Sequence, residues 1–229
     1  MFKNFILLVI VVLGYVSNAI GQISIKEAES FVKKGKSAES NNDINAAVIH
    51  YTKAIELDPK NVEAYKSRAI LNHSTKNYTE AINDCTKAIE LDPKVIYPFY
   101  IRGNSYLLLK KYPEAIADLT KNLERDRRNE PAYSSRAMAY LSLKKYAEAI
   151  EDCTKGIEVY SSSVTCYCFR AMAYYALDKY REAVIDCNRA IEIEPKTAIA
   201  YKTRSLAYQQ LGENKAAAAD MAVFKYLTK

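Results

Sequence analysis

The sequence repeats itself every 34 residues, and this period constrains the fold more than any other feature. The nine residues TKAIELDPK occur at 52–60 and again at 86–94. Counting on from Asp84 in steps of 34 reaches an aspartate each time, at Asp118, Asp152, Asp186 and Asp220. Six frames follow, which we call repeats 1 to 6: 28–61, 62–95, 96–129, 130–163, 164–197 and 198–229. Units of this kind bury their apolar faces against their neighbours in a stack.

Each repeat has the residue pattern of two amphipathic helices. Positions are numbered from the first residue of each repeat. Positions 4, 8 and 11 have the spacing of one helix face, as do positions 20, 24 and 27. Small residues at positions 8 and 20 let the paired helices approach closely. Position 4 is aromatic and position 20 is alanine throughout: Phe31, Tyr65, Phe99, Tyr133, Tyr167, Tyr201, and Ala47, Ala81, Ala115, Ala149, Ala183, Ala217. The sequence therefore predicts an all-α chain.

Proline and cap-forming residues mark the end of the repeats. Pro59, Pro93 and Pro195 occupy position 32, where proline stops the second helix. Arg127 and Ser161 stand there in repeats 3 and 4, so the sequence constrains these two turns least. Residue types that cap a following helix occupy position 34: Asn61, Asn129, Ser163 and Thr197.

This pattern resembles the tetratricopeptide repeat. The family signature has an aromatic at position 4, small residues at 8 and 20, tyrosine at 11, alanine at 27 and proline at 32, and residues 28–229 follow it. The resemblance implies a right-handed α-solenoid of tandem helix-turn-helix repeats. It also implies a non-enzymatic scaffold that binds a protein or peptide partner in its concave groove. Departures are local, with Ala38 and Asn72 at position 11, and Asn122, Gly156 and Phe224 at position 27.

The resemblance also implies where a partner binds. In the family, positions 2, 5, 6, 9 and 12 of each repeat face the ligand. Here these positions give an apolar and aromatic surface in repeats 3 to 5, with a lysine in repeat 2: Lys66, Tyr97, Tyr100, Ile101, Asn104, Ser135, Met138, Cys168, Phe169, Met172 and Tyr175. Exposed patches of this composition tend to mark partner sites. The alternative is that a neighbouring repeat or a terminus covers this surface.

Chaperone-binding members of the family clamp a terminal carboxylate with lysine, arginine and asparagine side chains. Val32, Ser67 and Tyr97 stand at three of the clamp positions in repeats 1 to 3. We therefore expect no carboxylate-clamp chaperone binding, and a partner held by apolar and stacking contacts.

The competing class is a structural, self-associating protein whose groove or C-terminal end is covered by another copy. Met221, Phe224 and Leu227 lie on the last predicted helix, and terminal repeats usually need a polar outer face. We therefore expect a homo-oligomer, or partner docking, through the C-terminal helix.

Residues 1–21 differ from the rest. Lys3 precedes twelve uncharged residues, 5–16, and small residues surround Ala19 and Gly21. A spanning helix needs about 20 apolar residues, whereas this pattern is typical of a secretory signal. We predict a signal peptide at 1–21, cleaved after Ala19 or Gly21, and a short linker at 22–27. We expect export to the periplasm or the medium, with no membrane contact after cleavage; the alternative is an uncleaved N-terminal anchor.

No catalytic, metal-binding or cofactor motif is present in the sequence. Cys85, Cys153 and Cys187 occupy the packing position 24, and neighbouring helices about 10 Å apart exceed the roughly 7 Å Cα separation of a disulfide. Cys166 and Cys168 are two apart on one helix and point in different directions. We therefore expect core cysteines and neither a redox site, nor a metal, nor a cofactor.

The charges are spread along the chain. The net charge is +6, and no basic stripe is formed, so we expect no nucleic-acid partner. Arginine recurs at position 7 and aspartate at position 23, which favours structural ion pairs over a site: Arg68, Arg102, Arg136, Arg170 and Arg204.

Overall fold

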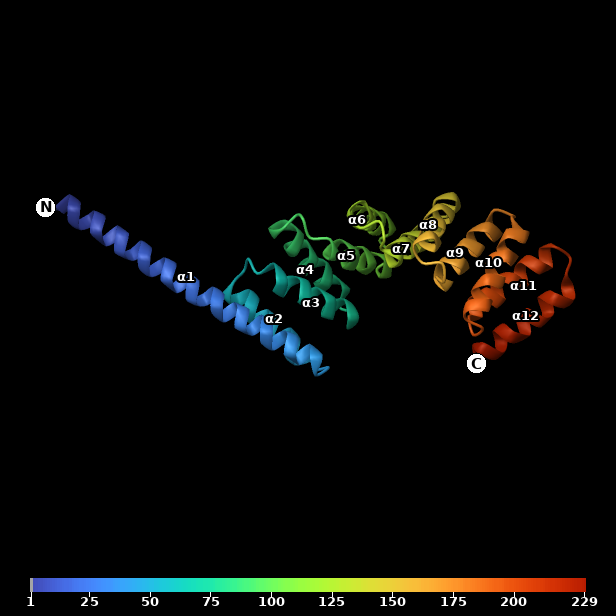
Figure 1. Cartoon of the computed structure of the whole chain (residues 1–229), viewed down its shortest axis with the longest axis horizontal. Coiled ribbons are helices and arrows are strands. Elements are labelled where there is room, and N and C mark those ends of the chain that lie inside the picture. Colours follow the sequence, from blue (N-terminus) through green and yellow to red (C-terminus); the bar gives the residue numbers. More distant parts are fainter. Residues whose placement is uncertain (1) are drawn as a thin grey trace. The chain divides into compact units, whose positions relative to one another are not determined.

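The structure is a computed structural model that describes the backbone of residues 2–229 and the side chains of residues 21–229. The described chain contains twelve helices and no strand, as predicted (Figure 1). They are α1 (Phe2–Ser40), α2 (Ile44–Leu57), α3 (Val62–Ser74), α4 (Tyr78–Leu91), α5 (Tyr97–Leu108), α6 (Tyr112–Arg125), α7 (Glu130–Ser142), α8 (Tyr146–Val159), α9 (Val164–Ala176), α10 (Tyr180–Ile193), α11 (Ala198–Gln210) and α12 (Asn214–Leu227).

The chain divides into two compact units, residues 1–101 (unit 1) and residues 102–229 (unit 2). In unit 1, α1 packs on α2 and α3 packs on α4, and α2 also contacts α3. In unit 2, the pairs α7–α8, α9–α10 and α11–α12 pack in the same way, and each second helix contacts the first helix of the next repeat. The first helices α7, α9 and α11 also contact one another in sequence order. Each unit is therefore a stack of helix pairs.

The predicted linker at 22–27 is not a separate segment, because α1 runs through it. No proline or glycine interrupts residues 22–27, and Ser24 Oγ donates a hydrogen bond to the carbonyl oxygen of Leu57 at 2.6 Å. The predicted signal peptide at 1–21 lies outside the described side chains, except for Gly21. Within residues 21–229, no helix has the length and apolar composition needed to cross a membrane.

The first helix of every repeat ends in the same turn. The residue at position 15 has a positive φ in all six repeats: Asn42, Lys76, Lys110, Lys144, Asp178 and Gly212. In repeat 4, the amide of Lys145 donates to the carbonyl of Tyr140 at 2.9 Å, and the amide of Lys144 donates to Leu141 at 3.0 Å. This pair of bonds is a Schellman motif, which satisfies the last carbonyls of the helix.

All second helices end at position 30, with or without proline at position 32. Helices α6 and α8, which are not followed by this proline, end at Arg125 and Val159. Both residues occupy position 30, as does Leu57, where α2 ends before Pro59. The side chains of Asn61, Asn129 and Ser163 then cap the next helix, as predicted, whereas Thr197 makes no side-chain cap bond. The turns therefore do not depend on the proline.

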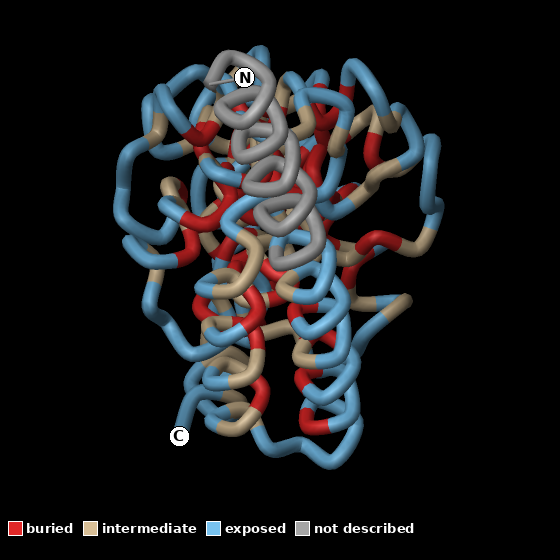
Figure 2. The backbone as a smooth tube through the Cα atoms, turned by 90° about the vertical axis from the view of Figure 1, so that its left-hand side faces the viewer, coloured by how far each residue is buried: buried red, intermediate tan, exposed pale blue. Residues whose placement is uncertain are grey.

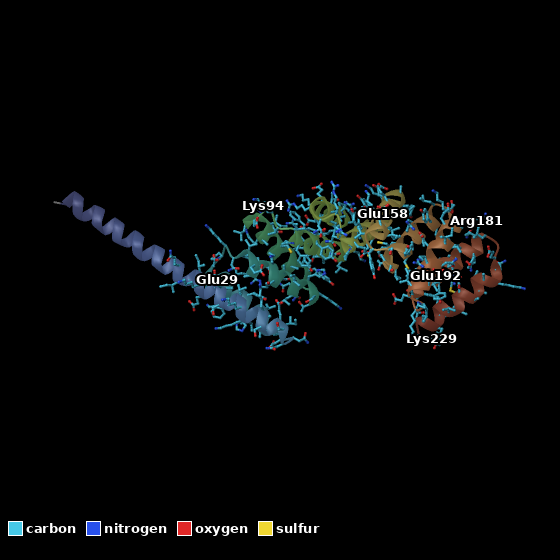
Figure 3. The ribbon with its side chains drawn as sticks, viewed as in Figure 1. Glu29, Lys94, Glu158, Arg181, Glu192 and Lys229 are labelled. Carbon is cyan, nitrogen blue, oxygen red and sulfur yellow. The ribbon has the colours of Figure 1, made fainter. Side chains whose placement is uncertain are left out.

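Buried residues line the facing sides of the helices, and exposed residues cover the outside (Figure 2). The alanines at position 20 are all buried. Glu158, Arg181 and Glu192 of unit 2, which are labelled in Figure 3, are exposed.

In repeats 1 to 5, the residues at positions 8 and 24 compensate each other in size. Gly35 faces Tyr51, and a Cβ added at Gly35 would lie 2.6 Å from the Tyr51 ring. Gly103 faces Leu119, and an added Cβ would lie 2.8 Å from Leu119 Cγ. Where position 24 is the smaller cysteine, position 8 is alanine: Ala69 with Cys85, Ala137 with Cys153, and Ala171 with Cys187. The cysteines at position 24 are core residues, as predicted.

Candidate partner-binding site

The first helices of repeats 4 and 5 carry a partly exposed apolar surface in unit 2. We call it the α7–α9 patch, and it consists of Ser135, Met138, Phe169, Met172 and Tyr175. Met138 is 44% exposed, and the other four are half-buried. Met138 and Met172 both occupy position 9, on helices that contact each other. No charged residue belongs to this patch.

Helix α11 extends the same row of first helices. The half-buried Leu206 occupies position 9 there, as Met138 and Met172 do in the two preceding repeats. The aromatic ring of Tyr175 packs on that of Tyr180, with ring centroids 5.6 Å apart. The ring contact holds Tyr175 against α10 at one side of the patch. The sequence reasoning did not include Leu206, although position 9 alone would have indicated it.

Two of the predicted surface residues lie in the core instead. Ile101 is 4% exposed and packs with Ala69 and Cys85 of the preceding repeat. Cys168 is 3% exposed and belongs to a cluster with Ala200 of the following repeat. Neighbouring repeats cover these side chains, so neither presents a surface to a partner.

The predicted residues of unit 1 have a different character. Lys66 Nζ lies 2.8 Å from Glu63 Oε2, and Lys36 Nζ lies 2.8 Å from Glu63 Oε1. Hydrogen bonds from Lys36 and Lys66 lower the pKa of Glu63. The rings of Tyr97 and Tyr100 lie 5.7 Å apart on α5. Lys66 is therefore held in an ion-pair network, and the aromatic pair of Tyr97 and Tyr100 lies later in the same unit. The remaining predicted residue, Asn104, is half-buried on the part of α5 that belongs to unit 2.

The repeated arginine and aspartate residues form the predicted structural ion pairs. In repeat 4, Arg136 donates two hydrogen bonds to Asp152, at 2.6 and 2.7 Å. It donates a third to Thr120 Oγ1 of the preceding repeat at 2.8 Å. The same paired contact recurs between Arg68 and Asp84, Arg102 and Asp118, Arg170 and Asp186, and Arg204 and Asp220. A network that joins each helix pair internally explains why these charges recur.

All five cysteine side chains are buried thiols. Burial raises the pKa of Cys168 to about 12 and also raises that of Cys187. The neighbouring thiol of Cys166, together with burial, raises the pKa of Cys153. A reactive thiol requires the opposite shift. Among the described side chains, no group of three His, Cys, Asp or Glu residues could hold a metal ion.

The contact between Cys153 and Cys166 was missed by the sequence reasoning. From the sequence, only pairs of cysteines at position 24 and pairs on one helix are considered, and not a pair that joins position 24 to position 3. In the stack, position 24 of one repeat packs near position 3 of the next, as Cys187 does with Ala200. A cysteine at position 24 of one repeat and another at position 3 of the next are the sequence signal from which this contact could be predicted.

The helix-pair architecture agrees with the sequence comparison. Models of the tetratricopeptide repeat match residues 28–61, 62–95, 131–163 and 164–197, which together make up more than half of the chain. The chain belongs to the tetratricopeptide repeat family. A search of the curated proteins finds no match.

Solved tetratricopeptide repeat structures share this fold. MamA is 24% identical, with a TM-score of 0.70, over 76% of this chain and 94% of its own. A tetratricopeptide repeat protein from Parabacteroides merdae is 23% identical, with a TM-score of 0.73, over 86% of this chain and 78% of its own. YrrB, described as having an unusual peptide-binding site, is 20% identical, with a TM-score of 0.68, over 74% and 88%. At these identities the likeness shows the fold alone.

Proposed function

We propose that this tetratricopeptide repeat protein is a non-enzymatic scaffold that binds a protein or peptide partner on the α7–α9 patch. The observation that carries this proposal is the partly exposed side chain of Met138 on α7. Helix α7 contacts α9, which carries Met172 and Phe169. Packing in the core does not require methionine and aromatic side chains at these positions of the first helices. Members of the family bind protein partners in general, and the fold-level likeness to YrrB supports a peptide ligand.

The chemistry of the patch indicates the kind of segment that binds. Its side chains are apolar or aromatic, with a single hydroxyl from Ser135, and methionine adapts its shape to different partners. A partner segment with apolar anchors would bury them here, and charged ends would contribute little. The carboxylate clamp is absent from the sequence, so a terminal carboxylate is not the expected anchor.

Co-purification with matched variants tests the proposal. Met138→Lys/Met172→Lys adds two charges to the patch. Val159→Lys/Ile185→Lys adds the same two charges to exposed positions of the second helices α8 and α10, where Val159 is 38% exposed and Ile185 is 65% exposed. We expect the patch variant to lose a partner that wild type and the control retain, with all three equally folded by circular dichroism. Equal recovery of every protein would overturn the proposal.

In unit 1, Lys66, Tyr97 and Tyr100 provide a second contact region that is proposed separately. Tyr100→Lys is compared with Ile49→Lys, because Ile49 is 66% exposed on α2. Loss of the partner from the Tyr100 variant alone would assign this region to binding. Recovery of the partner with both variants would exclude this region from binding.

We also propose that the chain is exported, on the basis of residues 1–21. N-terminal sequencing of the mature protein from the host checks this expectation. A new N-terminus at Ile20 or Gln22 supports cleavage at the predicted sites. An intact Met1 in the envelope fraction supports the anchor instead, and an intact Met1 in the cytoplasm contradicts export.

The alternative function is self-association through α12. Tyr226 is 78% exposed on this helix, and Met221, Phe224 and Leu227 are half-buried. If a second copy covers this face, Tyr226→Glu lowers the association constant measured by sedimentation velocity, while partner recovery through the α7–α9 patch is unchanged. A monomer at all concentrations for the wild type removes this alternative.

A further inference from the structure

Cys153 on α8 and Cys166 on α9 bring two thiols together between repeats 4 and 5. Both side chains are completely buried in one cluster. Cys153 lies three residues before Gly156, on the same face of α8, and Cys166 Sγ lies directly against Gly156. Cys166 Sγ donates to Glu130 Oε1 at 3.2 Å, and Ser163 Oγ donates to the same oxygen at 2.5 Å. Contacts from α7 and from the start of α9 therefore fix Cys166 beside Cys153.

This junction is the one place in the sequence where both facing positions are cysteine. At the other four junctions, the position that corresponds to Cys166 is held by alanine or proline: Ala64, Pro98, Ala132 and Ala200. The neighbouring position 27 is also unusual, because it is Gly156 here. A Cβ at Gly156 would lie 2.6 Å from Cys166 Sγ, too close for any real contact. The glycine therefore makes the room that the second sulfur occupies.

We propose that Cys153 and Cys166 form a disulfide that links repeats 4 and 5 when the chain folds in an oxidising compartment. Two S–H bonds break and one S–S bond forms. The two electrons and two protons pass to the oxidant, a small-molecule or oxidoreductase disulfide, which becomes two thiols. Because both thiols are fully buried in the folded unit, oxidation takes place before α9 closes on α8. The bond then restricts the unfolded chain and stabilises the junction.

A second pair of cysteines provides the competing outcome. Cys168 and Cys187 belong to one cluster, but they lie in the same repeat and would not link two repeats. Cys166 and Cys168 point away from each other on α9. The pair of Cys153 and Cys166, beside which Gly156 makes room for a sulfur, is therefore the one assigned.

Refolding and mass spectrometry test the assignment. The reduced full chain is unfolded in urea and refolded by dilution into reduced and oxidised glutathione, and the remaining thiols are blocked with N-ethylmaleimide. Trypsin cleaves after Lys155, so the proposed bond joins two peptides, and fragmentation distinguishes Cys166 from Cys168. We expect a Cys153–Cys166 link with a loss of two hydrogen atoms, and three blocked cysteines. Five blocked cysteines, or a dominant link between Cys168 and Cys187, would overturn the proposal.

A stability measurement gives an independent readout. We expect the urea midpoint of the oxidised wild type to fall when a reductant is added. Cys166→Ala should show no such shift, because alanine stands at this position in three other repeats. Cys187→Ala is the control and should retain the shift, whatever its absolute stability. A reductant-dependent shift that persists in Cys166→Ala would contradict the assignment.

Discussion

At the scale of single residues, the core is organised by the exchange of volume between positions 8 and 24. Glycine stands opposite Tyr51 and Leu119, and alanine stands opposite each cysteine of position 24. Interiors are packed closely enough for one methyl group to be felt. The cysteines are therefore explained by size: they are the residues that leave room for alanine across the helix pair.

The first prediction tests this exchange in repeat 3. Gly103→Ala places a Cβ 2.8 Å from Leu119 Cγ, and we expect a destabilisation of about 1–3 kcal/mol from overpacking. Adding Leu119→Cys recreates the alanine and cysteine pair of repeats 2, 4 and 5. We expect the double variant to be more stable than the sum of the single effects predicts, in a urea double-mutant cycle. Additive losses would contradict the compensation.

At the scale of the helix, the turn after each first helix depends on one left-handed residue. Only Gly212 among the six can adopt that conformation without a side-chain penalty; the others are asparagine, aspartate or lysine, at φ values from 58 to 65°. The hydrogen bonds of the turn hold them there.

The second prediction concerns this turn. Lys144 has φ 59°, and a non-glycine residue in this region costs about 1–2 kcal/mol. We expect Lys144→Gly to stabilise the chain by about 1 kcal/mol in urea unfolding. Gly212→Lys is the reverse control, and its added Cβ meets nothing within 4 Å, so its effect reports the backbone alone. A destabilised Lys144→Gly would show that the lysine makes a compensating contact.

The third prediction concerns the link between α1 and α3. The folded pKa of Glu63 lies below its ordinary value, so the bridge stabilises the fold above the unfolded pKa and is lost as the pH falls through the folded one. We expect Glu63→Gln to cost less than about 1 kcal/mol at neutral pH, because partly exposed ion pairs contribute little. The cost should disappear between about pH 5 and pH 3. An equal destabilisation by Glu63→Gln at both ends of this pH range would show that the ion pairs of Glu63 are not its source.

At the scale of the whole molecule, the sequence predicted what depends on local spacing. The period places the helices, the buried alanines of position 20 and three of the four caps at position 34. It could not place Ile101 and Cys168, because a side chain at position 5 or 6 is covered or exposed according to how the adjacent repeats pack. The Cys153–Cys166 contact was missed for the same reason. The partner of the proposed scaffold depends on surface chemistry that the repeat signature does not encode.

The fourth prediction uses the cysteines as reporters of both units. Cys85 lies in unit 1, and the other four lie in unit 2. In the reduced chain at neutral pH, we expect no thiol to react with N-ethylmaleimide on the time scale in which the urea-unfolded chain reacts fully. Burial and the raised pKa values of Cys153, Cys168 and Cys187 are the reason. Rapid native labelling of any one cysteine would show that its repeat opens locally.

The volume exchange between positions 8 and 24 also limits how such a gene can be rearranged. A crossover inside a repeat, between its two helices, would join the glycine of one repeat to the cysteine of another and leave a void, or join an alanine to a leucine and create a clash. A crossover at a repeat boundary transmits both halves of each pair together. Duplication by whole repeats is therefore the rearrangement that keeps the core packed, and the letter-for-letter copy of TKAIELDPK in two adjacent repeats has the register that such an event leaves.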